Sequence, residues 1–129
     1  MPYYQFTVPT GSATLQRKAE VAAAMTKVHS NVTGAPATYV QCSFVEVPPG
    51  SIFVAGEAVE APRMVGIIRE GRSAEVRAKL IHGLADAWCE ITGETKESLL
   101  IVLQEVPGAN TLENGVIMPE ITDDPAAIY

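Results

Sequence analysis

Two stretches of the chain carry apolar side chains at spacings of three and four residues, which is typical of amphipathic helices that bury one face. The stripe of the first stretch runs through Leu15, Ala19, Ala22, Met25 and His29. The stripe of the second runs through Val76, Leu80, Leu84, Ala87 and Ile91. Thr14 and Ser73 stand just ahead of the two stretches. They are predicted N-caps, because a hydroxyl can accept a hydrogen bond from the first free amides of a helix.

Each predicted helix is preceded by a short segment of strand character, Tyr3 to Val8 in the first half and Met64 to Ile68 in the second. A further strand is expected after each helix, within residues 39–44 and 98–103. Two strands joined by a helical crossover run parallel. Each half of the chain therefore reads as a β-α-β unit.

The two halves are related by a weak internal repeat with an offset of 59 residues. Val32-Thr33-Gly34 recurs as Ile91-Thr92-Gly93, and Glu46-Val47-Pro48 recurs as Glu105-Val106-Pro107. The repeat predicts two equivalent units placed side by side, with four strands in one sheet and both helices on one face.

This organisation predicts a single α+β (α/β) domain over residues 1–129, with units at about 2–48 and 61–107. A sheet with helices on one face only leaves the other face to be covered, and self-association is the obvious solution. Because only 6% of the residues are aromatic, we expect that interface to be mainly aliphatic. Trp88, on the second helix, is expected in the core or in the interface.

Three segments fall outside the two units. Ser51–Gly56 and Gly115–Met118 are predicted to form short extra strands. The tail 119–129 is acidic and irregular, and we expect it to cover or extend an edge of the sheet.

Composition narrows the classes of function. The net charge is −6, with 9 basic against 15 acidic residues, which argues against nucleic acid or an anionic membrane as a partner. Cys42 and Cys89 match no metal or redox spacing and are expected to be reduced, buried and apolar in character. The sequence contains no metal-ligand cluster and no glycine-rich phosphate loop. Without a bilayer-spanning apolar stretch or a signal-peptide pattern, a cytoplasmic location is expected.

The chain begins Met1-Pro2, and removal of Met1 would leave Pro2 with a free secondary amine. An α-amino group titrates at roughly 7.7–8.0, and burial or nearby cations lower that pKa towards neutrality. Such a group can act as a base or, when protonated, as an acid. The alternative is that Pro2 merely opens a strand, where proline is tolerated.

An amino-terminal proline ahead of two β-α-β units resembles the tautomerase superfamily, and the chain is most similar to its cis-3-chloroacrylic acid dehalogenase subgroup. The resemblance runs from Pro2 to about Pro119. Its most specific segment is Arg69-Glu70-Gly71-Arg72-Ser73, supported by His29 and by Leu112-Glu113-Asn114-Gly115. It implies the tautomerase fold, a barrel-like homotrimer and no cofactor.

The resemblance also implies roles for individual residues. Pro2, His29 and Glu113 match the family's catalytic positions, and Arg69 and Arg72 match the two arginines that bind the substrate carboxylate. The family's tyrosine is not matched, because Val102 stands at its position. Taken without the resemblance, the arginines could be surface residues that pair with nearby acids. Glu113 could likewise be a solvated loop residue, and His29 could cap helix carbonyls or lie satisfied in the core.

Three functions follow as hypotheses. The first is enol–keto tautomerisation of a small 2-hydroxy-alkenoate such as phenylenolpyruvate, with Pro2 as the base. The second is dehalogenation or hydration of 3-haloacrylates or acetylenic acids with His29 and Glu113, which the change to Val102 weakens. The third is a non-catalytic binding protein that retains the fold.

Overall fold

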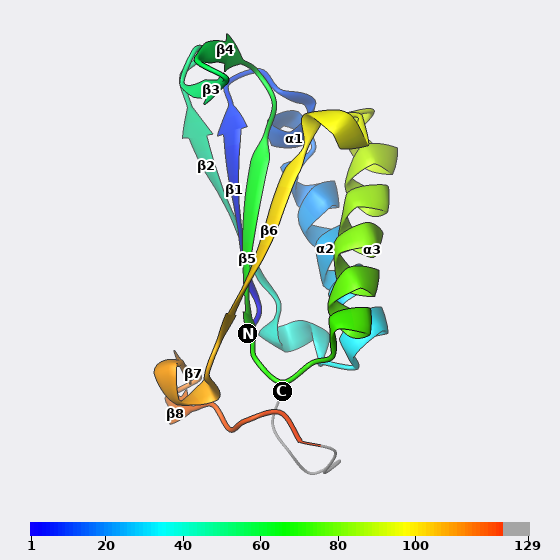
Figure 1. Cartoon of the computed structure of the whole chain (residues 1–129), viewed down its shortest axis with the longest axis vertical. Coiled ribbons are helices and arrows are strands. Elements are labelled where there is room, and N and C mark those ends of the chain that lie inside the picture. The colour runs from blue at the N-terminus through cyan, green and yellow to red at the C-terminus, as the bar shows by residue number, and fades with distance from the viewer. Residues whose placement is uncertain (123–129) are drawn as a thin grey trace.

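The computed structural model describes residues 1–122 and shows a sheet backed by helices on one side (Figure 1). The strands of the four-stranded sheet are β1 (Tyr3–Pro9), β2 (Gln41–Val47), β5 (Arg63–Arg69) and β6 (Leu100–Val106). Their order is β2-β1-β5-β6. The pairs β1–β2 and β5–β6 are parallel, and the central pair β1–β5 is antiparallel. The predicted duplication of a β-α-β unit and the predicted sheet are confirmed.

The helices are α1 (Ala13–Gln16), α2 (Lys18–Thr33) and α3 (Ala74–Thr92). Ser73 caps α3 as predicted, and its hydroxyl accepts from an amide of the first turn at 3.2 Å. The prediction that Thr14 is a cap is wrong, because Ser12 caps α1 with an equivalent hydrogen bond of 3.2 Å. Thr14 is instead buried and accepts a hydrogen bond from the indole nitrogen of Trp88 at 2.8 Å.

The offset of the internal repeat changes along the chain. β1 and β5 start 60 residues apart and share one burial pattern, whereas β2 and β6 start 59 residues apart. The segment from Ser12 to the left-handed Gly34 is two residues longer than the segment from Ser73 to Gly93. The extra length is accommodated at Arg17, where α1 ends and α2 begins with φ −112° and ψ 26°. A constant offset of 59 was therefore too simple a prediction.

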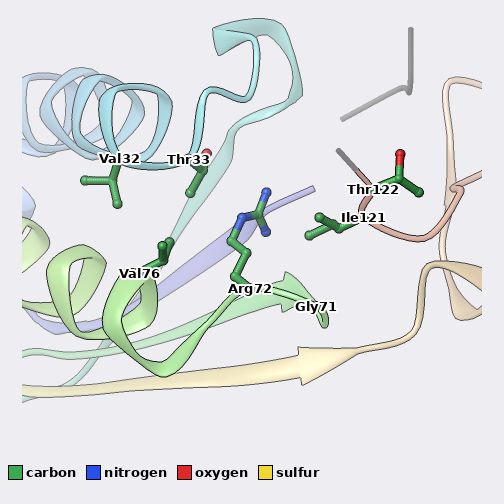
Figure 2. A pocket seen from close by; sticks show the side chains of 7 residues that line it. All are labelled: Val32, Thr33, Gly71, Arg72, Val76, Ile121 and Thr122. Carbon is green, nitrogen blue, oxygen red and sulfur yellow. The ribbon is translucent and has the colours of Figure 1, made fainter. Parts of the chain in front are cut away.

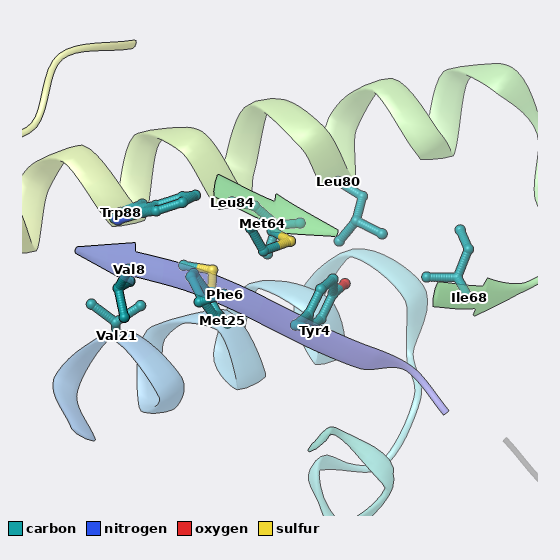
Figure 3. Close-up of a cluster of buried hydrophobic side chains, with 10 residues drawn as sticks. All are labelled: Tyr4, Phe6, Val8, Val21, Met25, Met64, Ile68, Leu80, Leu84 and Trp88. Atoms are coloured by element: carbon teal, nitrogen blue, oxygen red, sulfur yellow. The ribbon is translucent and has the colours of Figure 1, made fainter. Parts of the chain in front are cut away.

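One hydrophobic core fills the space between the sheet and the helices (Figure 3). Its buried members are Tyr4, Phe6, Val8, Val21, Met25, Met64, Ile68, Leu80, Leu84 and Trp88. On α2 the buried residue is Val21 rather than the predicted Ala22, because the helix restarts after Arg17 with a different phase. On α3 the indole of Trp88 fills the centre of the stripe, and Ala87 packs at its margin.

The sheet face opposite the helices is open and carries aliphatic side chains. Val45, Val65, Leu100 and Val102 lie on it and are between 41% and 51% exposed. Two hairpins extend beyond the sheet, one at each end in Figure 1. They are β3 (Ile52–Val54) with β4 (Glu57–Val59), and β7 (Leu112–Glu113) with β8 (Val116–Ile117). The two predicted extra strands are confirmed as β3 and β8.

Short 3₁₀ turns at Ala37–Tyr39, Lys96–Ser98 and Gly108–Asn110 complete the described elements. The part of the predicted acidic tail from residue 123 onward lies outside the described residues. Cys42 and Cys89 are free thiols that are partly rather than fully buried, and burial raises the pKa of Cys42 to about 11. Within residues 1–122, no helix is long and apolar enough to cross a membrane.

A polar pair is enclosed at one end of this core. The hydroxyl of Tyr4 lies 2.6 Å from Nδ1 of His29, and both side chains are fully buried. Gly66 makes room for this pair, because a Cβ at that position would lie 2.6 Å from Cε1 of the Tyr4 ring. Burial lowers the pKa of His29 to about 3, with smaller contributions from the charges of Arg72 and the terminal amine. His29 is therefore neutral in the folded protein at ordinary pH.

The neutral state of His29 predicts a loss of stability in mild acid. Below a pH of about 6.5 the unfolded chain binds a proton at this histidine and the folded chain does not, so acid favours unfolding until the pH nears about 3. Between pH 7.5 and 5.5 the wild type should lose about 1 kcal/mol more unfolding free energy than His29→Gln. Urea unfolding at one fixed protein concentration measures this difference.

The matched control is His82→Gln, since the other histidine lies on the exposed side of α3. This variant is expected to keep the pH dependence of the wild type. If His29→Gln also kept that pH dependence, His29 would not be a buried neutral group.

Candidate active site

The chain terminus lies at the start of β1, beside the β7–β8 hairpin (Figure 1). Pro2 is buried, and its carbonyl accepts a hydrogen bond from the amide of Gln41 at 3.1 Å, which ties it to β2. The amine of Met1 forms a hydrogen-bonded ion pair with Oε1 of Glu113. The side chains of Met1 and Glu113 are each 8% exposed, so this ion pair is largely shielded from solvent.

The β7–β8 hairpin positions Glu113. Asn114 and Gly115 follow it with φ of 54° and 76°, the left-handed backbone of a two-residue hairpin turn. While Oε1 faces the terminal amine, Oε2 accepts from Nε2 of Gln41 at 3.2 Å. Both carboxylate oxygens thus have partners, and Glu113 is not an ordinary solvated loop residue.

The two arginines of the Arg69–Ser73 segment lie at the end of β5 and in the loop that leads to α3. Arg69 is the last residue of β5, is 2% exposed and donates to the carbonyl of Pro119. Arg72 follows Gly71, whose φ of 118° sets the turn towards the helix. The carbonyl of Arg72 accepts from Nη1 of Arg77 at 2.6 Å, and the same Nη1 lies 3.6 Å from a glutamate of β6. This bracing by Arg77 fixes the loop that carries Arg72.

The charges of these groups act on one another. Burial lowers the pKa of the Met1 amine, and the guanidiniums of Arg69 and Arg72 lower it further. The contact with Glu113 opposes this change, but the pKa remains below its ordinary value. Arg72 and the amine in turn both lower the pKa of His29. The terminal amine therefore forms one electrostatic unit with the four side chains predicted around it, which are those of His29, Arg69, Arg72 and Glu113.

Two pockets flank this unit. The larger, about 390 Å³, is lined by Val32, Thr33, Gly71, Arg72, Val76, Ile121 and Thr122. Figure 2 shows the side chain of Arg72 reaching into it, between the end of α2 and the segment that carries Ile121. The smaller, about 300 Å³, is lined by Met1, Pro2, Tyr3, Gln41, Thr111, Leu112, Glu113 and Asn114. The smaller pocket is the one that contains both the terminal amine and the carboxylate of Glu113.

Val102 lies away from these groups. It pairs with Val65 on the open face of the sheet and is 42% exposed, whereas His29 is buried on the helix side. Within one chain, the position of the missing tyrosine is thus separated from His29 by the sheet itself.

Sequence reasoning did not identify Tyr4 and Gln41 as members of the site. Tyr4 alternates with Phe6 and Val8 along β1, so it faces α2 on the same side of the sheet as His29. That alternation was visible in the sequence, but the pairing with His29 depends on the three-dimensional packing. Among the described residues, no group of three or more His, Cys, Asp or Glu side chains is arranged to hold a metal ion.

Known proteins share the sequence pattern and the fold of this chain. The family model described as "Putative oxalocrotonate tautomerase enzyme" matches residues 1–127. N1, a member of the cis-3-chloroacrylic acid dehalogenase family, is 29% identical with a TM-score of 0.86, over 92% of this chain and 84% of N1. No curated protein matches the chain significantly.

Two further solved structures are similar. Pt0534, inactivated by 2-oxo-3-pentynoate, is 26% identical with a TM-score of 0.81, over 89% of this chain and 94% of that one. The symmetric trimer of wild-type Q0 fused 4-OT is 23% identical with a TM-score of 0.80 over the same shares, and at that identity it supports the fold alone. By the family model and these structures, the chain belongs to the tautomerase superfamily and resembles its cis-3-chloroacrylic acid dehalogenase-like subgroup.

Proposed function

We propose that the protein is an amino-terminal-proline tautomerase that converts small 2-hydroxy-alkenoates to 2-oxo acids. The observation that carries this proposal is the environment of the terminal amine, which contacts Glu113 and whose pKa is lowered by burial first and then by the charges of Arg69 and Arg72. The amine in the structure belongs to Met1, and removal of Met1 would move it to Pro2, one peptide unit away.

The reaction needs a neutral amine at the pH of the cell. A Pro2 amine in the surroundings that lower the pKa of the Met1 amine would be unprotonated to a larger extent near neutral pH. The amine would take the proton from the 2-hydroxyl of the enol while the C2–O bond becomes a carbonyl. The same proton would then be delivered to C3, which restores the free amine. No water or external reductant is consumed.

Substrate binding would fall to the arginines. A guanidinium presents paired N–H donors that match the two oxygens of a carboxylate, and the N-terminus of α3 adds its own preference for anions. Arg72 is suited to this role because its side chain reaches into the larger pocket and Arg77 braces its backbone (Figure 2). The inactivation of the relative Pt0534 by 2-oxo-3-pentynoate is consistent with a site for 2-oxo acids in this chain.

Hydration or dehalogenation of unsaturated acids is the second candidate. The similarity to N1, of the cis-3-chloroacrylic acid dehalogenase family, favours it, and Glu113 would have to activate the water. In this chain Val102 offers no hydroxyl to position that water. We therefore place this activity second, as a side reaction of the same site.

We further propose that the chain assembles as a homotrimer through the open face of the sheet. The face carries a run of exposed aliphatic side chains, including Val65 and Val102, which a second copy could cover. The fused 4-OT relative is a symmetric trimer with the same fold.

The catalytic proposal predicts that activity depends on a free Pro2 amine. In protein whose mass shows that Met1 is absent, Pro2→Ala should slow the ketonisation of phenylenolpyruvate by about 100-fold or more, because it replaces the positioned base. Protein that retains Met1 should be inactive, since its Pro2 nitrogen is an amide. Ultraviolet absorbance follows the reaction. Equal rates in all three preparations would exclude the proposal.

The binding proposal predicts a specific effect of Arg72. Arg72→Ala should lower kcat/KM by about 30-fold, equivalent to roughly 2 kcal/mol for hydrogen bonds to a charged group. Arg17→Ala is the matched control, because Arg17 is an exposed arginine that pairs with Glu20 at 3.1 Å away from the site. A kcat/KM that falls equally in both variants would count against carboxylate binding by Arg72.

The assembly proposal predicts that Val65→Glu yields monomers in sedimentation velocity, because it buries a charge in the aliphatic interface. Ala23→Glu, on the exposed side of α2, should leave the trimer intact. A trimer that persists in Val65→Glu would show that the open face is not the interface.

A further inference from the structure

Within residues 1–122, one ring nitrogen of His29 has a hydrogen-bond partner and the other has none. Nδ1 lies 2.6 Å from the hydroxyl of Tyr4, while Nε2 is buried and has no hydrogen-bond partner among the described residues. Buried polar atoms without partners are uncommon in native proteins, and each calls for an explanation. The surroundings of His29 suggest an explanation, because the charges of Arg72 and the terminal amine act on its ring and contribute to lowering its pKa.

The contact with Tyr4 constrains the tautomer of His29. A neutral imidazole has one N–H donor and one acceptor nitrogen. If Nδ1 carried the proton and donated to Tyr4, the phenolic hydrogen and Nε2 would both lack partners in the core. If the phenol donates to Nδ1, only the proton on Nε2 remains without a partner. Since an unmet buried donor or acceptor costs about 1–3 kcal/mol, the second arrangement is favoured.

Two further observations support a phenol that donates. Burial raises the pKa of Tyr4 well above its ordinary value, so the hydroxyl keeps its proton. The ring is also held in place, because Gly66 leaves space for it and its edge packs against the His29 ring with centroids 5.7 Å apart. The hydroxyl therefore stays directed at Nδ1.

We propose that Tyr4 is a positioning residue that fixes His29 as its Nε2–H tautomer, and that His29 thereby donates a neutral hydrogen bond to the 2-oxygen of the substrate. This assignment rests on the proposed tautomerase function. Charge develops on the 2-oxygen when its proton leaves, and a preorganised donor that does not itself titrate can stabilise that charge. The carboxylate, which is charged throughout, is left to the arginines.

The test combines a spectroscopic and a kinetic measurement on Tyr4→Phe, a change that removes only the hydroxyl. The chain has two histidines, so ¹⁵N chemical shifts of labelled imidazoles are readily assigned, with exposed His82 as an internal reference. In the wild type, Nε2 of His29 should be protonated and Nδ1 should not. In Tyr4→Phe the proton should redistribute towards Nδ1, and kcat should fall by about 10-fold to 100-fold, as is usual when a supporting hydrogen bond is lost.

Thr14→Val is the matched control. It removes another buried hydrogen bond between side chains, the one that Trp88 donates at 2.8 Å, in a different part of the core. This variant should lose at least as much stability to urea as Tyr4→Phe and still keep the wild-type kcat and His29 tautomer. A wild-type His29 protonated at Nδ1, or a kcat unchanged in Tyr4→Phe, would overturn the proposal.

Pro2→Ala, assayed in parallel, separates this proposal from the one on which it rests. If Pro2→Ala is inactive and Tyr4→Phe is fully active, only the role of Tyr4 fails. If Pro2→Ala is as active as the wild type, the tautomerase proposal fails, whatever Tyr4→Phe does. The ¹⁵N measurement needs no turnover and reports the tautomer in either case.

Discussion

The antiparallel pairing of β1 with β5 is the constraint on which the site depends. The two strands within each β-α-β unit run parallel, so the start of one strand does not lie beside the end of the other. Because the central strands run in opposite directions, Tyr3 at the start of β1 lies opposite Ile67 near the end of β5. The terminal amine is thereby brought next to Arg69, where β5 ends. No residue of the arginine motif is near Pro2 in sequence, and this one register places them together.

The hydrophobic core also sets the electrostatic environment at the end of the sheet where the terminal amine lies. His29 and Tyr4 are buried at the end of the cluster that faces the terminal amine, so their polar atoms are removed from water together. Burial keeps the imidazole uncharged near the guanidinium of Arg72, which would repel a cationic ring. The core thus does more than hold the helices on the sheet: it determines which neighbours of the amine carry charge.

The sequence predicted the parts that depend on periodicity. Alternation and three-four spacing gave the strands, the two long helices and the side of the sheet they cover, because burial of one face imposes those periods. The predicted N-cap at Thr14 was wrong. The first helical segment, which ends before Gly34, is two residues longer than its counterpart, and the sequence pattern of the repeat does not reveal this difference. The contacts of Glu113 with Met1 and Gln41 join segments distant in the chain, and no local pattern encodes them.

The offsets of the repeat also show which residues of the chain correspond to those around the terminal amine. With the offset of 60 that relates β1 to β5, the counterpart of Pro2 is Pro62, which is buried in the same way. Pro62 has Ala61 before it, so its nitrogen is permanently acylated and has no basic lone pair. On the helices the counterpart of His29 is Trp88, and at the strand end the counterpart of Arg69 is Pro9. The two-fold scaffold therefore carries a terminal amine, a buried histidine and a buried arginine at one end only, and the equivalent positions in the repeat hold Pro62, Trp88 and Pro9.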